Sequence, residues 1–170
     1  MKRRRWFDRE FPSGMPSDAV PELVERLRGT PARAQERLSQ VAPERAGRRV
    51  DGGWSPLEHV GHLADLEALW IGRLDDIAAG AALRAADLDN TGTWNAGHNQ
   101  AAPADLLNRL RAERTRLLDR IDQLGPADLD RTSRHPRLGT EMTVADLLFF
   151  VAEHDDHHLA AITELMGRGA

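Results

Sequence analysis

The sequence has 170 residues, of which 41% are hydrophobic, and its formal net charge is -4 at pH 7. A chain of this size is expected to form one domain over residues 1–170, with a core that needs no metal or disulfide for stability. Charges of both signs are interspersed, whereas nucleic-acid binding usually needs a basic face. We therefore expect a small-molecule partner and no nucleic acid.

The absence of cysteine narrows the chemistry further. It excludes disulfides, iron–sulfur clusters and cysteine nucleophiles, so a metal site has to use histidine and carboxylate ligands. No run of residues approaches the roughly eighteen apolar residues of a membrane span, and no signal-peptide core follows the basic residues 2–5. The sequence predicts a cytoplasmic protein with no membrane partner.

Residues 1–17 are interpreted as an N-terminal extension of the domain. They contain the basic cluster 2–5 and then Trp6, Phe7 and Phe11. Because short charge clusters are usually solvated, we assign the basic cluster no function. The extension is expected to be a solvated tail that docks through its three aromatic side chains.

Hydrophobic spacing predicts four helices and almost no strand. The first covers about 18–41, with a kink or restart where Thr30 would cap and Pro31 would begin a new helix. The second covers 56–79 and starts at a capping box, Ser55-Pro56-Leu57-Glu58. The third covers about 103–124. The fourth is capped at Thr143 and runs to about residue 166.

Four such helices predict an all-α fold, a four-helix bundle in which facing side chains can build a metal site. The long connection 80–102 leaves the helix order open at this point, because a crossover of that length can join parallel neighbours. Long connections tend to be functional or mobile. Its polar residues Asn95, His98 and Asn99 are therefore candidates for contacts with a substrate.

The most informative segment runs from His154 to His158 on the fourth helix. Residues four apart share a helix face, so these two imidazoles can reach one metal ion. Both fall within about 60° of Val151 on the apolar stripe, as does Asp155, whereas His157 lies about 120° away. The pair 154 and 158 is preferred over 154 and 157.

A third ligand is expected from a neighbouring helix, where His59 and His62 are both available. His59 lies inside the apolar stripe of the second helix, and His62 lies at its border. A histidine on a helix is more often a hydrogen-bonded or exposed side chain than a ligand. Helix angles alone leave the choice open, with a slight preference for His62 because a border position suits a ligand beside a solvent-reached cavity.

The motifs around these histidines resemble the DinB-like superfamily of bacterial proteins. They are residues 54–65, WSPLEHVGHLAD, and residues 150–160, FVAEHDDHHLA, and the likeness extends over about 21–165. The resemblance implies a four-helix bundle of up-down-down-up order, often a homodimer. It also implies a divalent metal held by three histidines, which map to His62, His154 and His158.

The resemblance implies two kinds of activity. Some relatives are regarded as metal-dependent hydrolases, and others are thiol S-transferases that use a low-molecular-weight thiol such as bacillithiol or mycothiol. A three-histidine site leaves coordination positions open, as catalytic sites do. It accepts zinc, nickel, manganese or iron. The alternative is a non-catalytic bundle whose metal or dimer interface has a structural or stress-response role.

Asp155 is the candidate catalytic residue, because His154-Asp155-x-x-His158 has the layout of the HExxH motif with a shorter acid. Its alternatives are a partner that orients an imidazole or an ion pair with an arginine of another helix. Glu58 and Glu153 carry the same ambiguity. Aromatic side chains that could wall an apolar pocket beside the metal are Trp54, Trp70 and Trp94.

Overall fold

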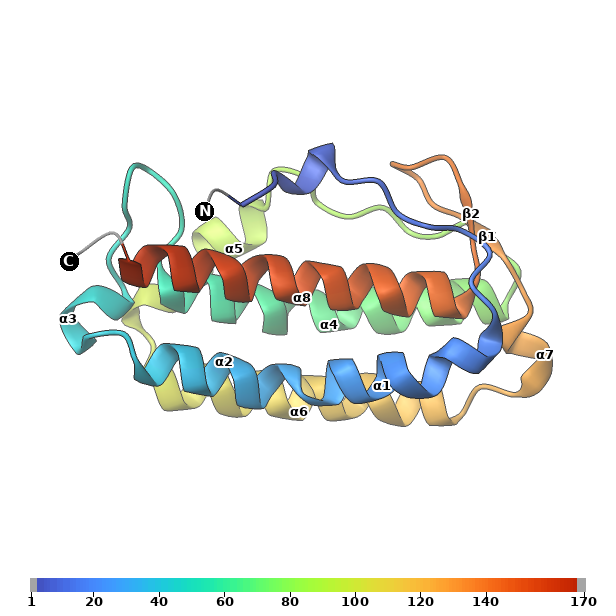
Figure 1. Ribbon diagram of the computed structural model, residues 1–170, viewed down its shortest axis with the longest axis horizontal. Coiled ribbons are helices and arrows are strands. Elements are labelled where there is room, and N and C mark those ends of the chain that lie inside the picture. The colour runs from blue at the N-terminus through green and yellow to red at the C-terminus, as the bar shows by residue number, and fades with distance from the viewer. Residues whose placement is uncertain (1–2, 168–170) are drawn as a thin grey trace.

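The computed structural model describes residues 3–167 (Figure 1). The first predicted helix is split into α1 (Val20–Arg28) and α2 (Thr30–Ser39), so the predicted restart at residues 29–31 is confirmed. The other long helices are α4 (Pro56–Ala78), α6 (Pro103–Asp122) and α8 (Val144–Gly167). All four predicted helices are confirmed, and their ends differ from the prediction by about two residues or less.

The helices form a bundle of up-down-down-up order, as the resemblance implied. In Figure 1, α1, α2 and α8 run from right to left, whereas α4 and α6 run from left to right. The connection 79–102 returns along the bundle, and α4 and α6 therefore pack as parallel neighbours. Helix α8 packs on the other side of α4 and also contacts α1 and α2.

Short elements fill the connections. They are the 3-10 turns η1 (Trp6–Asp8), η2 (Ser17–Ala19) and η3 (His98–Gln100), the helices α3 (Pro43–Ala46), α5 (Thr91–Asn95) and α7 (Pro126–Leu129), and the strands β1 (Ser133–Arg134) and β2 (Glu141–Met142). The two strands pair antiparallel, with Ser133 opposite Met142. They were not predicted, because two residues are too few to show alternation.

The hydrophobic core consists of two clusters separated along the bundle axis. One is built on α1, the second half of α4, the second half of α6 and the first half of α8. The other is built on α2 and on the remaining halves of α4, α6 and α8. Four buried polar side chains occupy the level between them, one from each long helix of the bundle. They are Thr30, Glu67, Arg114 and Asp155.

Thr30 was predicted to cap the restarted helix, and this prediction is wrong. No side-chain cap hydrogen bond is made at the start of α2. The Thr30 hydroxyl instead donates to Asp155 Oδ2 at 2.7 Å. A long-range partner has therefore replaced the local cap, because the buried carboxylate needs donors of its own.

The N-terminal extension docks along α8, and most of its described residues stay exposed, as expected of a solvated tail that docks. The backbone N–H groups of Gly14 and Met15 donate to the Asp146 carboxylate at 2.8 and 3.0 Å. Trp6 and Phe11 pack against the core as predicted. Phe7 does not, since 54% of it is exposed. Of the basic cluster, Lys2 lies outside the described residues.

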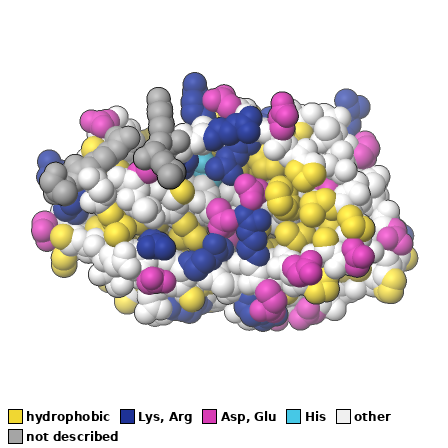
Figure 2. Space-filling model, in the orientation of Figure 1, with side chains coloured by type: hydrophobic (Ala, Val, Ile, Leu, Met, Phe, Trp, Pro, Cys, Tyr) yellow, Lys and Arg dark blue, Asp and Glu magenta, His cyan; other side chains and the backbone are white. Residues whose placement is uncertain are grey.

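Charged side chains of both signs alternate across the face that α8 and α2 present in Figure 2. Arg26 pairs with Glu153 at 2.6 Å, and Arg33 pairs with Asp156 at 2.5 Å. The described residues on this face therefore form no continuous basic stripe. Over residues 3–167, none of the helices has the length and hydropathy needed to cross a membrane.

Candidate metal centre

Three buried histidines from α4 and α8 converge in the bundle. The Nε2 atom of His154 lies 3.3 Å from Nε2 of His62 and 3.1 Å from Nε2 of His158. One ligand atom from each residue lies within 4.8 Å of the others. The side chains are 2%, 5% and 6% exposed for His62, His154 and His158, respectively.

Local sequence explains why these rings meet. His154 and His158 are one turn apart on α8, whose apolar stripe faces the bundle. The capping box fixes where α4 starts: Glu58 N–H donates to Ser55 Oγ at 3.1 Å, and Ser55 N–H donates to the Glu58 carboxylate at 2.9 Å. With the start fixed, the second turn of α4 carries His62 toward α8.

The arrangement fits a divalent metal ion. A tetrahedral zinc ion with Zn–N bonds of about 2.0–2.1 Å places its nitrogen ligands about 3.3 Å apart, close to the separations of the Nε2 atoms. Metal binding also requires neutral imidazoles. Burial lowers the pKa of His62 to about 4, and it lowers the pKa of His154 and His158 well below the usual value. All three rings are neutral near pH 7.

Two of the three rings are oriented through their other nitrogen. His62 Nδ1 lies 2.8 Å from Thr93 Oγ1, and His158 Nδ1 lies 2.8 Å from His59 Nδ1. When Nε2 faces an ion, Nδ1 carries the proton and donates to these partners. His59 therefore orients His158 through the nitrogen that points away from the cluster. His154 Nδ1 is buried without a hydrogen-bond partner among the described residues.

Replacing Thr93 by valine removes the acceptor for His62 Nδ1–H. We expect metal affinity to fall about 10- to 100-fold, because partners of ligand histidines fix the tautomer and the ring orientation. Competition with a chromophoric chelator measures the change. The control is Thr91→Val, since Thr91 is an exposed residue of the same short helix. Equal losses in both variants would contradict the assigned role of Thr93.

His157 belongs to a different set of contacts. Its ring lies against the Arg3 guanidinium, with Arg3 Nη1 3.1 Å from His157 Nδ1. Helix angles placed His157 at the border of the apolar stripe of α8. It is nevertheless only 8% exposed, because the N-terminal extension covers it. The cluster is thus formed by the pair 154 and 158, with His157 outside it.

Asp155 is completely buried in the polar layer below the cluster. Its Oδ2 accepts from Arg114 Nη1 at 2.7 Å and from the Thr30 hydroxyl at 2.7 Å. An ion pair with an arginine of another helix was one of its expected roles. Glu58 and Glu153 also have ion-pair partners, Arg49 and Arg26.

An open cavity of about 600 Å³ lies beside the cluster and is lined by all three histidines. The described residues that wall it include Trp54, Trp70 and Trp94, the aromatic side chains proposed for this role from the sequence. The N-terminal extension, the 80–102 connection and the β1–β2 turn lie along the same side of α4 and α8 (Figure 1), and each contributes residues to the cavity wall. These three segments together cover the cavity.

Other residues of the cavity wall were not predicted. Arg3, Arg73, His135 and Arg137 all line it. Arg73 lies within the buried stripe of α4, and a charged residue at such a position is a signal that sequence reasoning can use. Arg3 comes from the N-terminal extension, and His135 and Arg137 come from the β1–β2 turn. Such irregular segments have no hydrophobic periodicity that could predict which way a side chain faces.

Of the residues predicted from the 80–102 connection, the aromatic Trp94 lines the cavity and the polar ones do not. Asn90 and Trp94 line the cavity, whereas Asn95, His98 and Asn99 are not among its lining residues. The His98 ring instead packs against Gly61 of α4, where an added Cβ would lie 2.4 Å from the ring. Only glycine allows this approach, which fixes the connection against the bundle.

Acid is expected to destabilise the metal-free protein. Burial lowers the pKa of six histidines below 6.5, to about 3 for His59 and His157 and about 4 for His62 and His135. Between these values and pH 6.5 the unfolded chain binds more protons, so stability falls as pH falls, by up to about 1.4 kcal/mol per pH unit per group. Burial raises the pKa of Glu67 to about 7, so this carboxyl binds its proton more readily in the folded protein. Its effect on stability is opposite in sign and offsets that of one histidine.

Urea unfolding with chelator present at pH 7.5, 6.0 and 5.0 measures this dependence. The free energy of unfolding should be highest at the first pH and lowest at the last. A constant value over this range would show that the histidines are solvated in the folded protein.

The helical bundle thus gathers three neutral imidazoles beside an open cavity, an arrangement that can hold a metal ion. The chain belongs to the DinB superfamily, whose family model matches residues 26–162. None of the curated proteins matches the sequence significantly.

Solved structures share the fold at low sequence identity. YfiT from Bacillus subtilis, described as "a probable metal-dependent hydrolase with an unusual four-helix bundle topology", is 22% identical with a TM-score of 0.80, over 94% of this chain and 93% of that one. A mycothiol-dependent maleylpyruvate isomerase is 14% identical with a TM-score of 0.66 and covers 86% of this chain. The match spans only 60% of the isomerase. The DinB-like protein YjoA from Bacillus subtilis is 18% identical with a TM-score of 0.56, over 86% and 90%.

Proposed function

We propose that the protein is a metal-dependent enzyme that transfers a low-molecular-weight thiol to a small electrophile, with a divalent ion held by His62, His154 and His158. The observation that carries the proposal is that these three histidines line an open cavity of about 600 Å³. A purely structural zinc site is normally closed by four protein ligands. Three ligands beside a cavity leave room for a reactant.

A divalent cation at this site would act as a Lewis acid that lowers the pKa of a thiol or a water. Hydrolysis further requires a base that takes a proton from water. The carboxylates among the cavity-lining residues are Asp87 and Glu164. Asp87 accepts backbone N–H bonds from Thr91 and Asp89, and Glu164 pairs with Arg3. A thiol ionises near pH 8.5 and so is closer to its nucleophilic form at neutral pH than free water is, which supports thiol transfer.

The side chains around the cluster bind and shield the reactants. Trp6, Trp54 and Trp70 present apolar surface toward the histidines: their ring centroids lie 5.1 Å from His154, 4.6 Å from His62 and 5.6 Å from His154, respectively. In the proposed reaction the thiol sulfur forms a bond to an electrophilic carbon. The leaving group departs with its electron pair, and the thiol proton passes to solvent.

Two comparisons support different versions of this chemistry. The similarity to a mycothiol-dependent isomerase supports a thiol partner, and the similarity to YfiT supports hydrolysis as the alternative. Elemental analysis of the purified protein would show whether the metal is zinc, nickel, manganese or iron. A homodimer and a cytoplasmic location stay predictions, and sedimentation velocity tests the first.

The decisive experiment is an activity screen with the metal-loaded protein. Mycothiol or bacillithiol is supplied with a halogenated electrophile, and esters and amides are supplied without thiol. We expect thiol-dependent product that disappears on chelation and returns when metal is restored. Ester cleavage without thiol would favour a hydrolase, and no turnover with either set would favour a non-catalytic metal-binding bundle.

Chelation also tests whether the metal has a structural role. We expect removal of the ion to leave the helical content unchanged, because the two hydrophobic clusters and the buried polar layer hold the bundle without it. Circular dichroism before and after dialysis against a chelator measures this. Loss of the helical signal together with the metal would support a structural site instead.

A further inference from the structure

The cavity has a second cluster of polar side chains, apart from the three histidines. It consists of Arg73 from α4 and of His135 and Arg137 from the β1–β2 turn, all of which line the cavity. Trp70 and Phe150 connect the two groups: the Trp70 ring contacts His154 and the Arg73 guanidinium, and Phe150 contacts Trp70 and His135. Aromatic surface thus spans the distance from the metal ligands to this group.

Arg73 is a buried cation, 2% exposed, with no carboxylate hydrogen-bonded to it among the described residues. Its Nε donates to the carbonyl oxygen of Arg84 at 3.1 Å, and its Nη1 lies 3.1 Å from His135 Nε2. Asp76, a nearby acid, is held by the Arg84 side chain at 2.8 and 2.9 Å. Buried charges are usually paired, so Arg73 is an exception that points to a ligand.

His135 adds a second donor at the same place. Its Nδ1 accepts the backbone N–H groups of Arg137 and Leu138, each at 3.2 Å. A neutral imidazole carries one proton, so an accepting Nδ1 leaves Nε2–H facing the guanidinium of Arg73. The other tautomer would place Nδ1–H against two backbone N–H groups. In either tautomer, one N–H group of the His135 ring therefore faces another N–H donor. An acceptor bound between Arg73 and His135 would remove this unfavourable contact.

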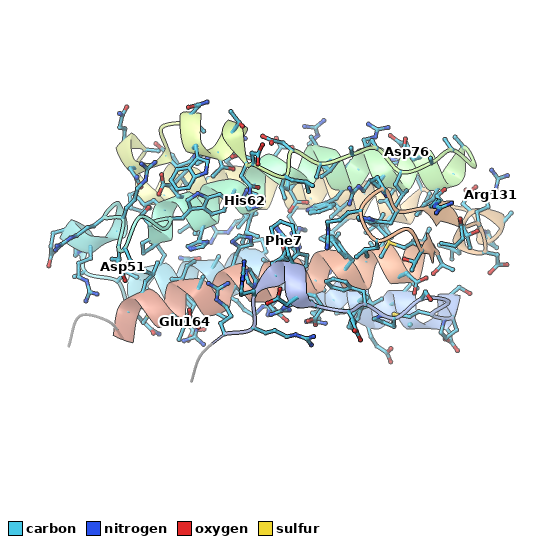
Figure 3. The ribbon with its side chains drawn as sticks, turned by 90° about the horizontal axis from the view of Figure 1, so that it is seen from above. Phe7, Asp51, His62, Asp76, Arg131 and Glu164 are labelled. Atoms are coloured by element: carbon cyan, nitrogen blue, oxygen red, sulfur yellow. The ribbon has the colours of Figure 1, made fainter. Side chains whose placement is uncertain are left out.

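Arg137 supplies a third unmatched donor. Its Nη2 atom is buried without a hydrogen-bond partner in the described part of the chain, and its guanidinium lies 5.3 Å above the Phe7 ring. In Figure 3, Phe7 lies between His62 and Asp76 along the bundle. Arg137 therefore lies against Phe7, which also lines the cavity.

The charge of this cluster is positive at neutral pH. Burial lowers the pKa of Arg73 to about 10, which still leaves the guanidinium protonated. Burial, with Arg73 and Arg137 nearby, lowers the pKa of His135 to about 4, so its ring is neutral. The two acids of the cavity wall, Asp87 and Glu164, already accept other donors.

We propose that Arg73, His135 and Arg137 form an anion subsite, and that the substrate of the metal site proposed above is a small molecule with an apolar body and a carboxylate. The carboxylate accepts from the guanidinium groups and from His135 Nε2–H. A planar guanidinium matches the two oxygens of a carboxylate. The apolar body lies along Trp70 and Phe150 and directs the reactive end toward the three histidines.

The test is equilibrium binding to the metal-free protein, so that a carboxylate has no metal to bind. The probe is hydrocinnamate, an aromatic carboxylate, and it is compared by calorimetry with its neutral amide and with phenethyl phosphate. We expect the carboxylate to bind at least about tenfold more tightly than the amide, because hydrogen bonds to charged groups contribute more than neutral ones. Equal affinities would overturn the proposal, and preference for the phosphate would overturn the choice of carboxylate.

Two substitutions locate the binding. Arg137→Gln lies in a surface turn and should weaken hydrocinnamate binding about tenfold or more, as should Arg73→Lys if it folds. The control is Arg134→Gln, since Arg134 is exposed on β1 and does not line the cavity. Unchanged affinity in Arg137→Gln would overturn the subsite. His62→Ala should lose metal and turnover but retain hydrocinnamate binding, which separates the subsite from the metal site. Hydrocinnamate binding by a metal-loaded wild-type protein that turns over no substrate would refute the proposed enzyme while leaving the subsite intact.

Discussion

Alanine at His154 is expected to abolish stoichiometric metal binding, because the Nε2 atom of this residue is the one within hydrogen-bonding distance of both other candidate ligands. If the roughly 10–16 kcal/mol of a four-ligand zinc site is shared evenly, each ligand contributes about 2.5–4 kcal/mol. Loss of one imidazole should then weaken binding about a hundred- to a thousand-fold. His62→Ala and His158→Ala should behave alike, as measured by elemental analysis after dialysis.

The matched control for these variants is His157→Ala. His157 lies on the same helix beside His158, but its ring contacts Arg3 and lies outside the three-histidine group. It should retain one metal ion per chain. Stoichiometric metal in all three ligand variants would refute the assigned site, and metal loss in the control alone would move the site toward the N-terminal extension.

Periodicity and local capping were enough to predict the bundle. Ser55 and Glu58 define the start of α4 through contacts three residues apart, and such contacts are visible in a sequence. The stripe on α8 correctly placed His154 and His158 on one buried face. Helix angles did not choose between His59 and His62, because both are buried. Their roles differ only in which ring nitrogen meets a partner, and this depends on tertiary contacts.

The cavity wall was the part least accessible to sequence reasoning. Arg3, His135 and Arg137 reach it from connections whose paths are set by long-range contacts, such as the bonds of Gly14 and Met15 to α8. A connection has no periodicity from which a facing direction follows. The prediction that Phe7 docks on the bundle was wrong for the same reason. Phe7 lines the cavity and is exposed there.

Methionine at Arg114 is expected to destabilise the fold by about 3–5 kcal/mol, because it leaves two buried carboxylates without their cation. Arg114 donates to Glu67 at 2.5 and 2.8 Å, to Asp155 at 2.7 Å and to the Leu27 carbonyl at 2.9 Å. It thus joins α6 to α4, α8 and α1. Urea unfolding measures the change, with Arg116→Met as control. Arg116 has 69% of its side chain exposed, so its loss should change stability by about 0.5 kcal/mol or less.

Asparagine at Asp155 separates a structural role for this residue from catalysis. The substitution keeps an acceptor for Thr30 but removes the charge beside Arg114, so we expect a loss of about 1–3 kcal/mol in stability. Because Asp155 does not line the cavity, metal content and turnover per folded molecule should change little. A general base would instead contribute about 10²–10⁴ in rate. A loss of that size in folded, metal-loaded Asp155→Asn would therefore restore Asp155 as the catalytic residue suggested by the motif.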